Sequence, residues 1–144
     1  MKFTSMETER KRLNELSANI IGLAIEVHRE TGPGLLESAY EACLTHEMTR
    51  SDLRFERQKE LPVRYKEVTL NCGYRVDFVI EDSILVELKA VDVVLPIHRA
   101  QLLTYLKLAE KPLGLLLNFN VPVLKEGIQR MVIGDLFQET TKNG

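Results

Sequence analysis

The amino-acid sequence predicts a single α/β domain in which helices flank a mixed β-sheet. Two amphipathic helical segments come first, and short strand-like segments follow them with one further helical segment in between. At 144 residues and 44% hydrophobic content, the chain is long enough to bury one core. Because no repeat, low-complexity tract or linker interrupts it, we expect residues 1–144 to form one domain.

Two helices are predicted in the first third of the chain. Thr4 and Glu7 have the spacing of a capping box, and the turn Gly32–Gly34 ends the helix that they begin. Its apolar residues recur at steps of three and four, at Leu13, Leu16, Ile20, Leu23 and Val27. A second helix is expected from Leu35 to Thr49, with a buried face made of Leu36, Tyr40, Cys43 and Leu44. Two histidines on these helices are expected at the surface, His28 and His46.

An extended segment from Arg54 to Tyr65 is predicted to precede a β-hairpin. The hairpin consists of Tyr74–Ile80 and Ile84–Ala90, which are rich in β-branched residues and are joined by the short polar segment Glu81–Ser83. We therefore expect these two strands to pair antiparallel.

One more helix and two more strands complete the predicted sheet. The helix follows Pro96 and extends from His98 to Glu110. The uniformly apolar run Leu113–Phe119 indicates a buried strand, and the alternating segment Leu124–Ile133 is a candidate edge strand. Because an exposed edge can pair with another chain, a homodimer or a partner protein is a candidate assembly.

Three charged residues of the hairpin are predicted to converge on one face of the sheet. Glu87 and Lys89 share a face because side chains alternate along a strand, and Asp77 lies on the neighbouring strand. A salt-bridged face open to solvent is one interpretation. The apolar strand and the flanking helices indicate instead a sheet covered on both faces, where charge is costly unless it binds something. Two carboxylates beside a lysine suit a divalent-metal site that cleaves phosphodiesters.

The Glu-x-Lys pattern alone is not specific, since Glu9-Arg10-Lys11 carries it on a solvated helix face. Two helical pairs add to it, because residues three or four apart share a helix face. Glu37 lies three residues before Tyr40, and Gln101 lies four before Tyr105. Each pair also has a structural interpretation, in which the tyrosines are core residues with bonded hydroxyl groups and Gln101 bonds the backbone. His98 is either a phosphate-contacting residue or an ordinary residue at a helix start.

Together these motifs resemble the PD-(D/E)xK nuclease superfamily, whose core is a restriction-endonuclease-like αβββαβ unit. Its RecB-type branch has a helical glutamate, a strand aspartate, an ExK strand and a QxxxY helix, which match the residues above. Gly34, Glu37 and Tyr40 also match the motif of the GxxExxY proteins, a bacterial group in that superfamily. The similarity extends over nearly the whole chain, and the first helix is an addition to the core.

The resemblance implies a Mg²⁺ or Mn²⁺ site and assigns residues to it. Asp77 and Glu87 would be ligands, with the backbone carbonyl of Leu88 and Glu37 as further ones. Lys89 would orient the attacking water, so the implied catalytic set is Glu37, Asp77, Glu87 and Lys89. The implied substrate-positioning set is Gln101, Tyr105, Tyr40 and His98. Val76 stands where the superfamily often has proline, and the cysteines of an iron–sulfur cluster are missing, so no such cluster is implied.

The expected function is metal-dependent hydrolysis of nucleic acid, with DNA favoured over RNA. An inactive nucleic-acid-binding or protein-interaction module and a hydrolase of small phosphoesters stay open as alternatives. The net charge of −2 gives no overall attraction to nucleic acid. No run is long enough to span a membrane and the first residues lack a signal-peptide core, so we expect a cytoplasmic protein. Cys43 and Cys72 are accordingly expected as reduced thiols.

Overall fold

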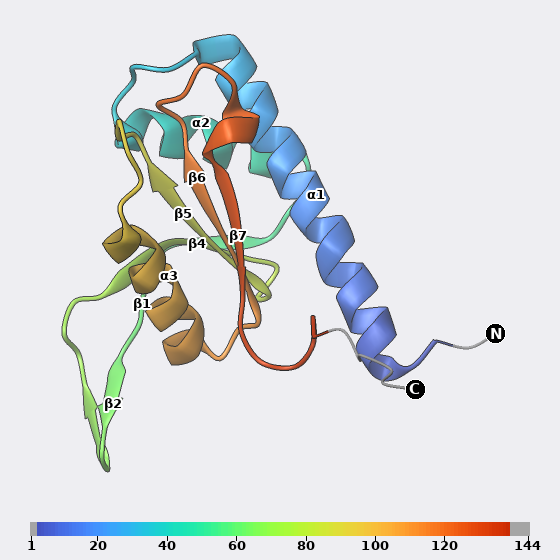
Figure 1. Ribbon diagram of the computed structural model, residues 1–144, viewed down its shortest axis with the longest axis vertical. Coiled ribbons are helices and arrows are strands. Elements are labelled where there is room, and N and C mark those ends of the chain that lie inside the picture. The colour runs from blue at the N-terminus through green and yellow to red at the C-terminus, as the bar shows by residue number, and fades with distance from the viewer. Residues whose placement is uncertain (1–2, 139–144) are drawn as a thin grey trace.

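A five-stranded mixed sheet with helices on both faces forms the centre of the computed structural model, which describes residues 3–138 (Figure 1). In spatial order its strands are β1 (Phe55–Glu60), β4 (Arg75–Ile80), β5 (Ile84–Lys89), β6 (Leu113–Asn118) and β7 (Ile128–Val132). β5 and β6 are parallel and are connected through α3 (Pro96–Ala109), whereas the other neighbouring strands are antiparallel. The predicted mixed α/β fold and its hairpin are confirmed.

Helices α1 (Ser5–Thr31) and α2 (Glu37–Arg50) cover one face of the sheet, and α3 covers the other. The predicted capping box begins α1, because Glu7 N donates to Thr4 Oγ1 at 3.1 Å and Thr4 N donates to Glu7 Oε2 at 3.2 Å. The core on the α1 and α2 face includes Ile20, Tyr40, Leu44, Phe78, Val86 and Leu88. The core on the α3 face includes Val79, Leu85, Leu102, Tyr105, Leu106 and Leu116.

Three local expectations were wrong. Leu36 is 76% exposed rather than buried, because it is the extended residue that precedes the first turn of α2. His28 is buried rather than at the surface, and its Nε2 lies 2.8 Å from the carbonyl oxygen of Val121. Only the second part of the predicted last strand is extended, since the 3₁₀ turn η1 (Leu124–Gly127) precedes β7.

A small hairpin that the sequence analysis missed projects from the sheet beside α3 (Figure 1). The extended segment predicted to reach Tyr65 leaves the main sheet after Glu60, at the end of β1. The chain then forms β2 (Val63–Tyr65) and β3 (Val68–Leu70), which pair with each other in a separate sheet. We call residues 61–74, which connect β1 to β4, the arm.

Candidate active site

The backbone pairing of β4 and β5 stops where the two predicted acids begin. Phe78 opposite Val86 is the last pair in this direction, so Asp77 and Glu87 come next. At that point Asp77 N donates to Glu87 Oε1 at 2.7 Å, and Leu88 N donates to Asp77 Oδ2 at 2.8 Å. Carboxylate oxygens therefore replace carbonyl oxygens as partners of these two amides. Both carboxylates are held at the place where the strands part.

Lys89 and Glu37 lie close enough to these acids to affect their ionisation. The two apolar neighbours of Glu87 pack on the α1 and α2 face, so Glu87 and Lys89 occupy the opposite face, as predicted. Glu37 is in the first turn of α2. Its pKa is raised by partial burial of its carboxyl group, an effect that Lys89 opposes and that Asp77 and Glu41 reinforce.

The pKa values of both strand acids are raised. Burial raises the pKa of Glu87 to about 8, and the neighbouring charge of Asp77 adds to the effect. Burial also raises the pKa of Asp77, although the Leu88 amide and Gln58 oppose it. Lys89 favours the charged form of both acids but does not cancel the shifts. Two adjacent acids that resist ionisation are typical of a functional site.

Gln58 and Glu41 belong to this site, although sequence reasoning missed both. Gln58 Nε2 donates to Asp77 Oδ1 at 2.9 Å and also to Glu41 Oε1. Glu41 Oε2 in turn accepts from Arg57 Nη2 at 2.8 Å. A glutamine amide nitrogen carries two hydrogens, so one side chain can hold both carboxylates. In the sequence Gln58 is one polar residue in a polar strand, and nothing there distinguishes it.

The backbone of Gln58 is also unusual. Its φ of +50° lies in the left-handed region, which costs a residue with a Cβ about 1–2 kcal/mol. The β1–β4 ladder has pairs on both sides of this position but none between Gln58 and Asp77. In β4, Val76 and Phe78 accordingly pack in different cores, although strict alternation would place them on one face. Both strands that border Asp77 therefore depart from regular pairing there.

The aromatic and polar residues predicted to position a substrate fall into two groups. Tyr105 on α3 is buried, and burial followed by the charge of Glu87 raises its pKa, while Gln101 acts in the opposite direction. The QxxxY pair therefore lies beside the acids. Tyr40 is fully buried, and its hydroxyl donates to Gly32 O at 2.6 Å and accepts from Leu35 N at 3.1 Å. It holds the turn that precedes Glu37.

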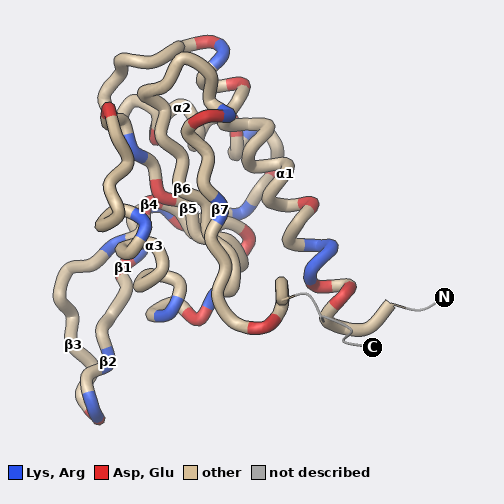
Figure 2. Tube along the Cα trace, viewed as in Figure 1, with Lys and Arg blue, Asp and Glu red and all other residues tan. Residues whose placement is uncertain are grey.

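His98 and Leu88, the remaining predicted site residues, both take part in hydrogen bonds that involve a backbone amide. His98 Nδ1 accepts from Leu95 N at 3.0 Å, which satisfies an amide at the start of α3. Leu88 contributes its backbone, because its side chain is in the core. In the trace of Figure 2, acidic and basic residues are interspersed along the chain. Within residues 3–138, no helix has the length and apolar character needed to cross a membrane.

The chemistry of Asp77 and Glu87 fits a hard divalent cation. No group of three or more His, Cys, Asp or Glu side chains in the described part of the chain is arranged to hold a metal ion. Mg²⁺, however, is commonly bound by one or two carboxylates, with water and substrate phosphate as the other ligands. Asp77 and Glu87, both with raised pKa values, provide such oxygen donors, and a nearby cation would offset their repulsion.

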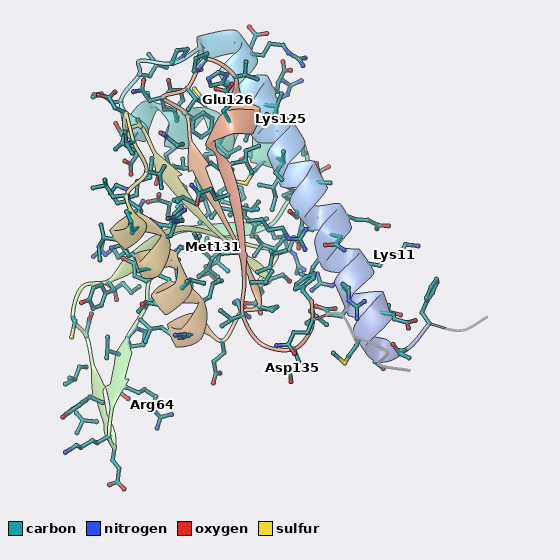
Figure 3. All side chains as sticks on the ribbon, viewed as in Figure 1. Lys11, Arg64, Lys125, Glu126, Met131 and Asp135 are labelled. Carbon is teal, nitrogen blue, oxygen red and sulfur yellow. The ribbon has the colours of Figure 1, made fainter. Side chains whose placement is uncertain are left out.

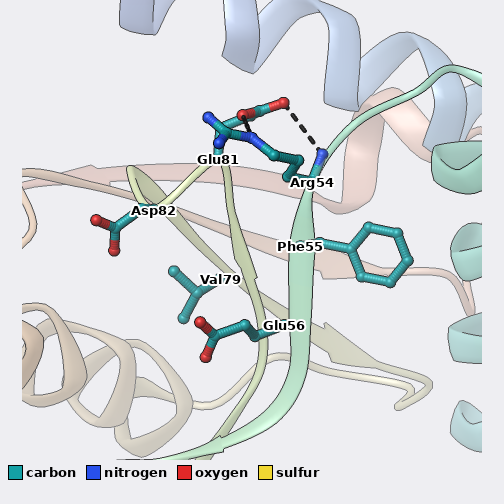
Figure 4. A pocket seen from close by; sticks show the side chains of 6 residues that line it. All are labelled: Arg54, Phe55, Glu56, Val79, Glu81 and Asp82. Atoms are coloured by element: carbon teal, nitrogen blue, oxygen red, sulfur yellow. Dashed lines mark hydrogen bonds and ion pairs between the residues drawn. The ribbon is translucent and has the colours of Figure 1, made fainter.

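A pocket of about 340 Å³ lies at the other end of β4, away from the acids (Figure 4). Arg54 borders it and pairs with Glu81, with 3.1 Å between Nε and Oε2. None of the predicted site residues is among those that line it, which are Arg54, Phe55, Glu56, Val79, Glu81 and Asp82. The candidate site is therefore defined by its paired acids rather than by this pocket.

Comparison with known families agrees with this geometry. The family model of the PD-(D/E)XK nuclease superfamily matches residues 14–131. The chain belongs to this superfamily. The match includes both strand acids, Lys89 and the QxxxY helix, and it confirms the predicted superfamily, while membership of the GxxExxY group stays a prediction. No curated protein and no solved structure gave a match.

Proposed function

We propose that this protein is a divalent-metal-dependent nuclease that hydrolyses phosphodiester bonds of nucleic acid, with DNA favoured. The observation that carries the proposal is the pair of adjacent carboxylates at the point where β4 and β5 part, with Glu87 buried and Asp77 partly buried. Burial raises the pKa values of both acids, so their charged forms are disfavoured without a bound cation. Membership of a nuclease superfamily supports the same chemistry.

In this proposal Asp77 and Glu87 hold Mg²⁺ or Mn²⁺. The Leu88 carbonyl would supply a third oxygen and Glu37 a fourth, directly or through water. The bound cation would supply Lewis-acid polarisation of the scissile phosphate. Lys89 shares a face with Glu87, so its ammonium would orient the attacking water and offset negative charge that develops on the phosphate.

The remaining residues would position these groups or the substrate. Gln101 and Tyr105 would hold the substrate backbone beside Glu87. Tyr40 would act through the turn that places Glu37, and His98 through the start of α3. We assign Gln58 as a positioning residue, because it bonds Asp77 Oδ1 and thereby limits the orientations of that carboxylate.

The test is cleavage of linear, nicked and single-stranded DNA, and of RNA, in the presence of Mg²⁺ or Mn²⁺. Wild-type protein should cleave at least one of these, and Asp77→Asn should not. Thermal melts provide a second measurement, since Mn²⁺ should stabilise the wild type and not Asp77→Asn. Full-rate cleavage by Asp77→Asn and Lys89→Ala would refute the assignment of roles.

Two outcomes would favour the alternatives instead. Binding of nucleic acid without cleavage at any metal concentration would favour an inactive binding module. Hydrolysis of free nucleotides but not of oligonucleotides would favour a small-phosphoester hydrolase.

Asp77→Asn removes one charge from a repulsive cluster, so the metal-free variant should be at least as stable as the wild type. A structural ion pair would behave oppositely, because loss of one buried partner costs about 3–5 kcal/mol.

A further inference from the structure

The arm presents an apolar face that no other part of the described chain covers. Val63 lies opposite Leu70 and Tyr65 opposite Val68, so these four side chains share one face of the hairpin. Tyr65 is 60% exposed, Val68 54% and Leu70 40%. An isolated two-stranded hairpin is only marginally stable in water. An open apolar face of this kind is therefore typical of a surface that binds a partner.

The arm also carries cations that no carboxylate neutralises. Arg64 and Lys66 form no ion pair among residues 3–138, and Glu67 is the only acid between residues 61 and 74. At the base of the arm, by contrast, Lys59 pairs with Glu56. The Lys66 ammonium lies 5.4 Å from the centroid of the Tyr65 ring. An exposed aromatic ring with a free cation beside it has the chemistry that binds bases and phosphates.

The arm is continuous with the candidate active site. Leu61 N donates to Tyr74 O at 2.8 Å, so the arm prolongs the β1–β4 pairing, and Tyr74 is three residues before Asp77. The Tyr74 ring lies 6.2 Å from the ring of Tyr105, whose pKa is affected by Glu87 and Asp77. Tyrosine rings are thus found beside the acids, at the base of the arm and next to its tip.

We propose that the arm binds a single-stranded segment of the nucleic acid whose phosphodiester bond lies at the acids. Tyr65 and Tyr74 would stack on bases, while Arg64 and Lys66 would contact phosphates. A single strand fits better than a duplex, because its bases are free to stack on exposed rings. Two unpaired cations would also contribute little toward the dense charge of a duplex. This inference rests on the proposed nuclease function and adds the form of the substrate to it.

The first test measures the binding of a short fluorescent single-stranded DNA by fluorescence anisotropy. EDTA is present so that metal-dependent cleavage cannot occur. Tyr65→Leu keeps an apolar side chain but removes the ring, and it should weaken binding about 10-fold, whereas Tyr65→Phe should bind like the wild type. Arg64→Ala and Lys66→Ala should weaken binding and lower its dependence on salt.

The chain provides a matched control for Tyr65. Phe3 is 64% exposed, and the Lys11 ammonium lies 5.8 Å from its ring centroid, so this pair repeats the chemistry of Tyr65 and Lys66. Figure 3 shows Lys11 on α1 well separated from Arg64 on the arm. Phe3→Leu should therefore leave DNA binding unchanged.

The second test separates the arm from the chemistry. Bis(p-nitrophenyl) phosphate is a phosphodiester too small to reach the arm, so Tyr65→Leu should hydrolyse it at the wild-type rate while losing activity on single-stranded DNA. Equal DNA binding by wild type and Tyr65→Leu would overturn the proposal, as would tighter binding of a duplex. A difference in oligomeric state between the wild type and Tyr65→Leu, measured by sedimentation, would also overturn it, because it would show that a second copy of the chain binds the arm. Binding that depends on Tyr65 without any hydrolysis would support the arm and contradict the nuclease function.

Discussion

Two segments of this chain, Glu9-Arg10-Lys11 in α1 and Glu87-Leu88-Lys89 in β5, share a pattern but not an environment. Glu9 is partly exposed and pairs with Arg12, with 2.6 Å between Oε1 and Nη2, and the hydrogen bond lowers its pKa. Glu87 is buried, and its pKa is raised to about 8. The same residue type is therefore shifted in opposite directions in the two places.

Geometry explains the contrast. Residues two apart on a helix do not share a face, so the glutamate and lysine of the α1 segment act separately. In a strand they do share a face, and β5 holds this face under α3 and beside a second acid. The pattern becomes a site only where the fold adds burial and a neighbouring carboxylate. Pairs of matched substitutions in the two segments test this conclusion.

The largest effect is expected for the two glutamates. Glu87→Gln keeps the volume of the side chain and removes a proposed ligand, so cleavage should fall at least about 100-fold, the upper range for groups that merely support a metal ligand. Glu9→Gln should cleave at the wild-type rate. Parallel assays with Mn²⁺ measure both. Similar rates for the two variants would mean that Glu87 has no special role.

The two lysines give the next largest effect. Lys89→Ala should lower the cleavage rate about 100-fold, because it removes a positive charge beside the phosphate. Lys11→Ala should have no effect, since its ammonium lies over the exposed ring of Phe3. Mn²⁺ affinity, measured by calorimetry, should not fall in Lys89→Ala. A loss of affinity equal to that of Glu87→Gln would indicate that Lys89 supports the acids rather than the reaction.

The contrast also shows which parts of the structure the sequence could reveal. Local rules predicted the helices and the main strands, through the capping residue Thr4, the apolar run Leu113–Phe119 and the β-branched hairpin with its short polar turn. Strand alternation predicted the shared face of Glu87 and Lys89, but it does not account for Asp77, whose neighbours Val76 and Phe78 pack in different cores. Gln58 was not predictable, because its role depends on a left-handed backbone that no local rule assigns to glutamine. The arm was missed because two strands of three residues give a weak signal.

A smaller effect is expected on the pH dependence of stability in the metal-free protein. The folded-state pKa of Glu87, about 8, exceeds its ordinary value of 4.5, so the folded protein retains a proton that the unfolded chain releases. Its contribution to stability is complete below pH 4.5 and is lost as the pH rises toward 8. Glu9 has a lowered pKa, so its contribution is lost instead as the pH falls.

Glu87→Gln removes this dependence, and melts of the metal-free proteins measure it. The stability of the variant relative to the wild type should increase by about 3 kcal/mol between pH 5 and pH 8. Glu9→Gln should show no such increase over the same range. A constant difference between Glu87→Gln and wild type at both pH values would contradict a raised pKa for Glu87.

The smallest effect concerns the strand opposite Asp77. Gln58→Ala removes the amide and keeps the cost of the left-handed backbone, whereas Gln58→Gly removes both. The glycine variant should be more stable than the alanine variant by about 1 kcal/mol. If the amide positions Asp77, both variants should bind Mn²⁺ about 10-fold more weakly than the wild type, to a similar extent.

Asp52 provides the control for this comparison. It is exposed, has a φ of +56° and follows α2, so Asp52→Gly and Asp52→Ala should differ in stability in the same direction without any change in Mn²⁺ affinity. Wild-type Mn²⁺ affinity in Gln58→Gly would show that the backbone of β1 matters and the amide does not. Loss of affinity in both Gln58 variants, despite the greater stability of the glycine one, would separate positioning from folding. It would also explain why a glutamine with a strained backbone lies beside the acids of β4 and β5. The Glu9-Arg10-Lys11 segment of α1 has no such positioning residue.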